Sequence, residues 1–167
     1  ILGDQIDIHC GGSDLIFPHH ENEIAQSEAW TGKEPFVRVW MHNGFVNVSG
    51  EKMSKSLGNF ATVKTTLARY NANTIRYFLL TNHYRMPVDF NEEALQSAEN
   101  RMNKIIRTLS NLSYFTEESA TDVFKTALLE AHYSNSKLID LKHQFIQSLS
   151  DDLNTPKALA VLNEAIT

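Results

Sequence analysis

The segment EKMSKSLGN at residues 51–59 is the one around which the rest of this sequence is arranged. It places Lys52 and Lys55 three residues apart, with Ser54 between them and Gly58 behind them. Lysines on a glycine-bounded loop are suited to binding phosphates, and hydroxyl and backbone N–H groups add donors without adding charge. Spacing alone does not separate a phosphate-binding loop from a solvated basic loop, so the neighbouring sequence has to decide.

Composition restricts the class of protein. The 167 residues are 42% hydrophobic and 21% charged, which is ordinary for a globular protein. No apolar run approaches the roughly 20 residues that span a bilayer, so we expect no membrane contact. Cys10 is the single cysteine, which excludes an internal disulfide framework and favours a cytoplasmic location. The chain opens on Ile1 without a signal peptide or an initiator Met, so we expect a piece of a longer protein.

Charge is segregated along the chain. The net charge of −5 combines an acidic first part, a basic middle part at residues 52–85 and an acidic last part. The middle part contains no acidic residue, and a basic block in an acidic protein is typical of a region that contacts a polyanion. A solvated helix face is the alternative. Its basic residues are Lys52, Lys55, Lys64, Arg69, Arg76 and Arg85.

The first third of the sequence predicts a strand followed by a ligand-binding loop. Residues 6–9 alternate as a strand does, and residues 10–14 follow as a loop. Gly11 and Gly12 would let a ligand approach the backbone, and Asp14 would accept hydrogen bonds from ribose hydroxyls. The alternative is that the glycines only form a turn and that Asp14 only caps it.

A helix is expected to begin near Pro18, because proline is tolerated in a first helical turn. His19 and Glu23 are i and i+4 on this helix and therefore share a face. Histidine with glutamate at that spacing is half of a plausible zinc site, since zinc takes four ligands. A hydrogen bond along the helix face is the alternative.

Two further strands precede the lysine segment, at residues 35–42 and 45–48, with a turn signal at Asn43-Gly44. This order of elements is typical of the later part of a nucleotide-binding α/β domain. We therefore predict an α/β fold over residues 1–60, with the lysine segment at its end.

Helical periodicity dominates from Thr62 onward. Residues 61–90 predict short helices, with Val63, Leu67 and Tyr70 on one face and Asn73 as the cap of the second. Residues 91–167 predict an all-α bundle whose apolar stripes are core packing. Its helices are expected to open near residues 91, 121, 138 and 155.

The motifs resemble one family. KMSKS at residues 52–56 is the signature of class I aminoacyl-tRNA synthetases, and FPHHENEIAQS at residues 17–27 is similar to the cysteinyl-tRNA synthetase family among them. DIH at residues 7–9, GGSDL at residues 11–15 and WMHNG at residues 40–44 extend the resemblance. So do YFLL at residues 77–80, HYR at residues 83–85 and DDLNTP at residues 151–156, so the match spans nearly the whole chain.

The resemblance implies a reaction, in which cysteine and ATP form cysteinyl-adenylate and the cysteinyl group passes to tRNA(Cys). It implies that Lys52 and Lys55 bind the triphosphate and stabilise charge on the leaving pyrophosphate, with Ser54 supporting the loop. It also places Gly11, Gly12 and Asp14 against adenosine, Asp14 at the ribose.

By the same resemblance, His19 and Glu23 match two ligands of a Zn²⁺ ion that binds the substrate thiolate. Such an ion separates cysteine from serine and removes the need for editing. His9 and His20 would line the amino-acid pocket, and no ligand role is transferred to Cys10. A monomer is expected.

Two departures from the family pattern leave alternatives open. The first catalytic signature of the class and two zinc-binding cysteines are not in this sequence, so we expect a fragment that is inactive alone and binds zinc weakly or not at all. The residues at 61–90 would contact the tRNA stem, and 91–167 would form part of a tRNA-binding bundle. The alternatives are a related cysteine ligase of mycothiol-type thiol-cofactor biosynthesis and a non-catalytic tRNA-binding module.

Overall fold

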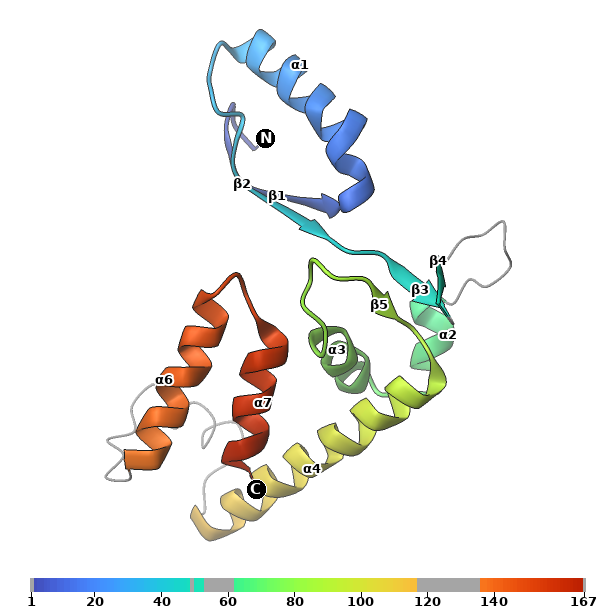
Figure 1. Ribbon diagram of the computed structural model, residues 1–167, viewed down its shortest axis with the longest axis vertical. Coiled ribbons are helices and arrows are strands. Elements are labelled where there is room, and N and C mark those ends of the chain that lie inside the picture. The colour runs from blue at the N-terminus through green and yellow to red at the C-terminus, as the bar shows by residue number, and fades with distance from the viewer. Residues whose placement is uncertain (1, 49, 53–61, 117–135, 167) are drawn as a thin grey trace. The chain divides into compact units, whose positions relative to one another are not determined.

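The computed structural model describes residues 2–48, 50–52, 62–116 and 136–166 (Figure 1). The chain divides into two compact units. The first unit contains residues 1–60 and 84–89, and the second contains residues 61–83 and 90–167. The helix predicted near residue 121 lies outside the described residues, as do Ser54 and Lys55.

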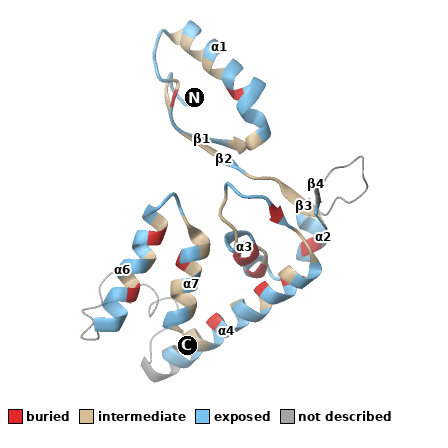
Figure 2. Ribbon diagram, in the orientation of Figure 1, coloured by how far each residue is buried: buried red, intermediate tan, exposed pale blue. Residues whose placement is uncertain are grey.

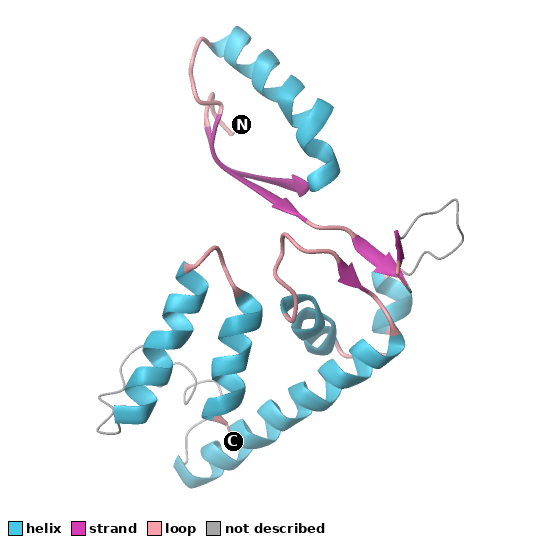
Figure 3. Cartoon of the chain, in the orientation of Figure 1, coloured by secondary structure: helices cyan, strands magenta, loops and turns pink. Residues whose placement is uncertain are grey.

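A parallel β-α-β arrangement forms the beginning of the first unit. Strand β1 (Ile6–Gly12) pairs in parallel with β2 (Val37–Asn43), and helix α1 (Glu21–Thr31) lies between them in sequence (Figure 3). A crossover of this kind is required because parallel strands cannot be joined by a tight hairpin. Helix α1 ends at Gly32, whose left-handed backbone (φ 65°) returns its N–H to the carbonyl of Glu28 at 2.8 Å.

Two short turns connect β1 to α1. They are the 3-10 turn η1 (Ser13–Leu15) and the π-helical turn η2 (Ile16–His20), which is kinked at Phe17. The prediction that Gly11 and Gly12 lie in a loop is wrong, because both belong to β1 and pair with β2. The strand continues through them because β2 supplies pairing partners as far as Gly12.

A three-stranded sheet completes the first unit. Strand β3 (Val46–Val48) lies between β4 (Glu51–Lys52), to which it is antiparallel, and β5 (Val88–Asp89), to which it is parallel. Just before β3, a Cβ on Gly44 would lie 2.4 Å from the carbonyl carbon of Met86. That neighbour is backbone and cannot move aside, so this crossing requires glycine.

The second unit is helical. Helices α2 (Val63–Leu67) and α3 (Ala72–Leu80) lead to the long α4 (Glu92–Thr116), and α6 (Ser136–Ser150) pairs with α7 (Thr155–Ala165). Helix α3 packs against both α4 and α7. Its cap is Asn71, whose side chain accepts from the N–H of Asn73, so the prediction of Asn73 as the cap is wrong by two residues. Asn71 is the cap because it has the extended backbone that a capping residue needs.

Burial in the second unit is concentrated where α3 meets α4 (Figure 2). Phe78 is 2% exposed and meets Phe90 edge-on with ring centroids 5.8 Å apart. Complete burial of such a side chain contributes roughly 1.5–3 kcal/mol to the free energy of unfolding.

The predicted apolar face of α2 is wrong, because Val63 and Leu67 are exposed. The buried side chain in that turn is Thr66, whose hydroxyl is satisfied by the carbonyl of Thr62 at 3.0 Å.

These observations confirm the predicted fold class, an α/β part followed by a helical part. The predicted division at residues 60 and 90 remains a prediction. Among the described residues, no helix is long and apolar enough to cross a membrane.

Candidate functional site

The pairing of β1 with β2 brings ring side chains to one face of the strands. His9 is the register partner of Trp40, and Gly11 is the partner of His42, so all four positions share that face. The rings of His9 and Trp40 meet edge-on with centroids 4.9 Å apart. The rings of Trp40 and His42 are stacked at 5.9 Å, with 6° between their planes.

His20, at the end of η2, is inserted among these rings. It is only 3% exposed, and its ring centroid lies 4.8 Å from that of Trp40 and 4.9 Å from that of His9. Gly11 lies against the same ring, since a Cβ there would come within 2.6 Å of Cε1 of His20. Glycine at position 11 is therefore what allows the histidine to be buried against the strand.

A ring-to-ring hydrogen bond orients His20. Its Nδ1 lies 2.8 Å from Nε2 of His42, so one ring donates and the other accepts, which couples the tautomer of each ring to that of the other. Burial lowers the pKa of His20 below its ordinary value of 6.5, and His9 lowers it further, while Glu23 acts in the opposite direction. The neutral form is favoured, and this is the form that can accept a hydrogen bond or bind a metal ion.

The carboxylate of Glu23, in the first turn of α1, contacts two histidines. Its Oε1 lies 3.3 Å from Nε2 of His19, the i,i+4 pair predicted from the sequence, and its Oε2 lies 2.9 Å from Nε2 of His9. Among the described residues, Oε2 is a buried oxygen that accepts no hydrogen bond. The imidazole and carboxylate thus lie close without satisfying one another.

This donor set fits a metal ion. One ligand atom from each of His9, His20 and Glu23 can be chosen so that all three lie within 4.8 Å of one another. Imidazole nitrogen and carboxylate oxygen both bind zinc. A buried carboxylate oxygen without a hydrogen bond is a position that a cation would satisfy. The sequence named His9 and His20 as pocket residues, and the structure brings them to the predicted pair.

The predicted nucleotide residues fall into two groups. Gly12 ends β1 and Asp14 lies in η1, where a Cβ on Gly12 would come within 2.5 Å of Oδ1 of Asp14. The Asp14 carboxylate therefore lies over the backbone at the carboxyl end of the strand. Lys52 lies in β4, while Ser54 and Lys55 fall outside the described residues.

Sequence reasoning missed Trp40 and His42 as members of the cluster. Alternation within the predicted strand at residues 35–42 places both side chains on one face, and that signal was available. The parallel register that joins this face to His9 was not readable from the sequence.

The fold and the site define a class: an α/β protein with candidate ligand residues toward the carboxyl ends of parallel strands, where open α/β sheets bind their ligands. The crystal structure of the ternary complex of Agrobacterium radiobacter K84 agnB2 LeuRS-tRNA-LeuAMS resembles it, with a TM-score of 0.70 at 18% identity. The likeness covers 96% of this chain and 21% of that chain, and it establishes the fold.

The family follows from sequence models. The model of the tRNA synthetases class I (C) catalytic domain matches residues 1–100, and a DALR domain model matches residues 144–167. The chain belongs to the tRNA synthetases class I (C) family.

Curated relatives agree with this family. Cysteine--tRNA ligase of Bacillus cytotoxicus is 49% identical over 164 residues, which is 96% of this chain and 33% of that protein. The same enzymes of Endomicrobium trichonymphae and Thermococcus onnurineus are each 48% identical, over 98% of this chain. The chain spans about a third of the length of the curated relatives it matches.

Proposed function

We propose that this chain supplies part of the amino-acid and ATP site, and part of the tRNA-contacting region, of a cysteine--tRNA ligase. The reaction joins cysteine to AMP from ATP with release of pyrophosphate, and the cysteinyl group then moves to the 3′ end of tRNA(Cys). The family match and the names of the relatives support the proposal. We place the enzyme in the cytoplasm, where translation occurs, and as a monomer.

The observation that carries the proposal is Oε2 of Glu23, which lies beside His9 and accepts no hydrogen bond among the described residues. We propose that Glu23 and His19, with His9 and His20 adjacent, form this chain's share of a zinc site. When bound, zinc would supply a soft Lewis acid that takes the cysteine thiolate in preference to the hydroxyl of serine.

The surrounding rings would shape the amino-acid pocket. The hydrogen bond between His20 and His42 holds the His20 ring, and the lowered pKa of His20 keeps that ring neutral. Trp40 contacts the rings of both His9 and His20 and would form one wall of the pocket. These contacts orient donors and acceptors before substrate arrives, which reduces the reorganisation that binding requires.

For ATP, we propose that the backbone at Gly11 and Gly12 approaches adenosine and that Asp14 accepts hydrogen bonds from the ribose hydroxyls. The Asp14 carboxylate lies directly over Gly12, so backbone and carboxylate offer one continuous contact. Lys52 and Lys55 are proposed to stabilise charge on the leaving pyrophosphate, with Ser54 supporting the loop.

For tRNA, we propose that residues 61–90 contact the stem. Lys64, Arg69 and Arg76 are exposed there, and Arg69 also pairs with Glu92. Residues 62–85, which include these three cations, contain no carboxylate. Exposed cations in such a stretch favour a polyanion, and their contribution falls as salt rises.

A chimera tests the proposed function. This chain would replace the aligned third of the Bacillus cytotoxicus enzyme, and cysteine-dependent exchange of pyrophosphate into ATP would be measured. We expect exchange with cysteine and none with serine, followed by cysteinylation of tRNA(Cys). A folded chimera that exchanges no pyrophosphate, or that acylates an amino sugar instead of tRNA, would overturn the proposal.

A further inference from the structure

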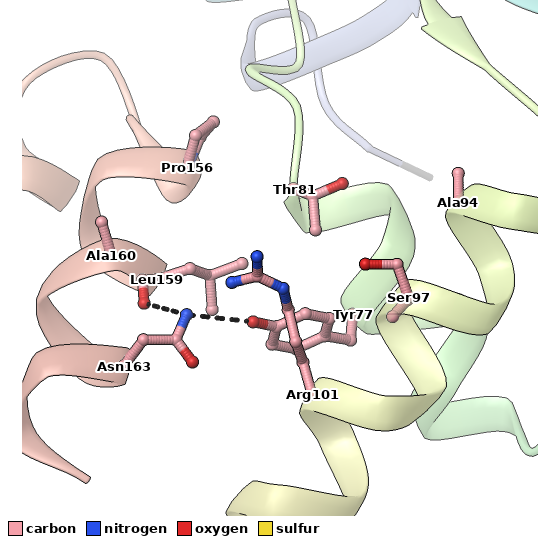
Figure 4. A pocket seen from close by; sticks show the side chains of 10 residues that line it. Tyr77, Thr81, Ala94, Ser97, Arg101, Pro156, Leu159, Ala160 and Asn163 are labelled. Carbon is pink, nitrogen blue, oxygen red and sulfur yellow. Dashed lines mark hydrogen bonds between the residues drawn. The ribbon is translucent and has the colours of Figure 1, made fainter. Parts of the chain in front are cut away.

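A second candidate site lies wholly within the helical unit, away from the histidine cluster in sequence. It is a cleft of about 330 Å³ between α3, α4 and α7 (Figure 4). Its volume is at the lower end of the range for small-ligand sites, enough for one nucleotide and too small for a duplex. Its lining residues include Tyr77 from α3, Arg101 from α4 and Leu159 from α7.

Small side chains open the cleft. Ala94, Ala98 and Arg101 follow one another at i, i+4 and i+7, so they share the face of α4 that looks into it. Leu159 and Ala160 line it from α7.

 The apolar carbon atoms of these residues form a wall that suits the flat face of a ribose or base. Pro156 begins the same wall one helical turn earlier (Figure 4).

The polar groups of the cleft include a cation and several hydroxyl donors. The guanidinium of Arg101 points from α4 toward the space beside Leu159 (Figure 4), and no ion pair engages it among the described residues. The hydroxyl of Tyr77 accepts from Nδ2 of Asn163 at 3.3 Å, so its own proton remains available to donate. Ser97 adds a second hydroxyl one turn before Arg101. No carboxylate from the described part of the chain lines the cleft.

A cation with convergent donors, and no carboxylate, selects an anionic ligand rich in acceptors. Because an apolar wall lies opposite, the ligand that fits both features is a phosphate joined to a ribose and a base. We propose that this cleft receives one nucleotide of the bound tRNA, with its phosphate on Arg101 and its ribose or base against Leu159. The inference rests on the tRNA contact proposed above and names a specific position for it.

Binding of a fluorescent tRNA(Cys) transcript to the full 167-residue chain, at fixed salt, tests this. Arg101→Gln removes the cation, and we expect about tenfold weaker binding, the usual cost of a charged hydrogen bond. Arg107→Gln makes the same charge change on α4 without lining the cleft, and we expect less than about a twofold loss, as for one exposed charge. Equal losses in both variants would overturn the proposal, because they would indicate only a general field.

A steric variant removes the dependence on charge. Ala160 is exposed, so Ala160→Leu fills the cleft without disturbing the buried core, which circular dichroism would check. We expect a loss of tRNA binding similar to that of Arg101→Gln, and unchanged tRNA binding in this folded variant would overturn the proposal.

Binding of AMP distinguishes the two possible sources of the nucleotide, which are tRNA and a free nucleotide. Saturable AMP binding that both variants abolish, with tRNA binding unaffected, would assign the cleft to a free nucleotide and overturn the tRNA assignment.

The proposed function fails separately. Pyrophosphate exchange in the chimera requires cysteine and ATP but no tRNA, so its absence would overturn the ligase proposal whatever the cleft binds. Exchange that is intact in a chimera carrying Ala160→Leu, with weaker tRNA binding, is the result expected if both proposals hold.

Discussion

Oε2 of Glu23 lies 2.9 Å from Nε2 of His9, yet among the described residues it accepts no hydrogen bond. A buried carboxylate oxygen without a donor is destabilising unless something satisfies it. The i,i+4 partner His19 engages the other oxygen at 3.3 Å. The geometry therefore leaves one oxygen directed at the place where His9 and His20 also present ring nitrogens.

Removing the charge of Glu23 should weaken metal binding. We expect Glu23→Gln to lower the zinc affinity of the full chain by at least about tenfold, since even residues that only orient zinc ligands change affinity by that much. Competition with a chromophoric zinc chelator measures it. Glu21→Gln is the matched control, because Glu21 occupies the same helical turn without joining the cluster. Equal affinities for the two variants would remove Glu23 from the proposed site.

A methyl group at position 11 should displace His20. Gly11→Ala would place Cβ 2.6 Å from Cε1 of His20, a ring that is 3% exposed and has little room to move. Overpacking of this kind costs about 1–3 kcal/mol. Urea unfolding measures the loss in the free energy of unfolding, and zinc affinity should fall with it.

The neighbouring glycine provides the control for that substitution. At Gly12 the added Cβ would meet Oδ1 of Asp14 at 2.5 Å, but this atom is the end of a side chain that can rotate away. We expect Gly12→Ala to destabilise the fold less than Gly11→Ala does and to leave zinc affinity unchanged. The reverse order of stabilities would show that the close approach to His20 does not govern this strand.

How far the sequence determines this site can be seen by comparing two pairs of residues. His19 and Glu23 were predictable because helical spacing is local: four residues always return to one face. His20 and His42 are 22 residues apart, and their 2.8 Å contact depends on the register of β1 against β2. Alternation predicts which face of a strand a residue occupies but not which residue lies opposite it.

The same distinction applies to the fold. The order of strands and helices followed from periodicity, and the structure confirms the α/β part and the helical part. The close approach of Gly44 to Met86 joins segments 42 residues apart, and local sequence offers only a turn signal there. The sequence also did not predict that Thr66 is buried in α2 while Val63 is exposed, and the reason there is different. A helix of five residues is positioned by its neighbours rather than by its own apolar pattern.

Stability of the helical unit should depend on pH through Tyr70 and Glu92. The Tyr70 hydroxyl donates to Oε1 of Glu92 at 2.7 Å. This bond, with Arg69 adding to it, lowers the pKa of Glu92 below its ordinary 4.5, and the same bond raises the pKa of Tyr70 above its ordinary 10.0. The lowered pKa of Glu92 contributes stability that is present above pH 4.5 and is lost as pH falls through the folded-state pKa. The raised pKa of Tyr70 contributes stability that is present below pH 10.0 and is lost as pH rises through its folded-state pKa.

Tyr70→Phe removes the hydroxyl and keeps the ring. We expect the parent chain to be more stable than this variant between pH 4.5 and 10.0, and the difference to shrink on the acid side of that window. Thermal unfolding followed by circular dichroism across about pH 3–8 measures the difference. This range begins about one and a half pH units below the ordinary pKa of a glutamate carboxyl and ends several units above it. A difference that stays constant down to the acid limit would exclude the ionised carboxylate as the partner of Tyr70.

Loss of Lys55 should affect chemistry rather than substrate binding. In the chimera, Lys55→Ala is expected to slow adenylate formation by about 10²–10³-fold, the usual effect of removing one group that stabilises developing charge. Its effect on the KM for cysteine should be small, because the lysine is proposed to contact the departing pyrophosphate. Lys64→Ala is the control, since Lys64 belongs to the same basic segment and lies in α2. Rapid-quench measurement of adenylate separates the two effects: an unchanged rate with a raised KM would assign Lys55 to ground-state binding instead.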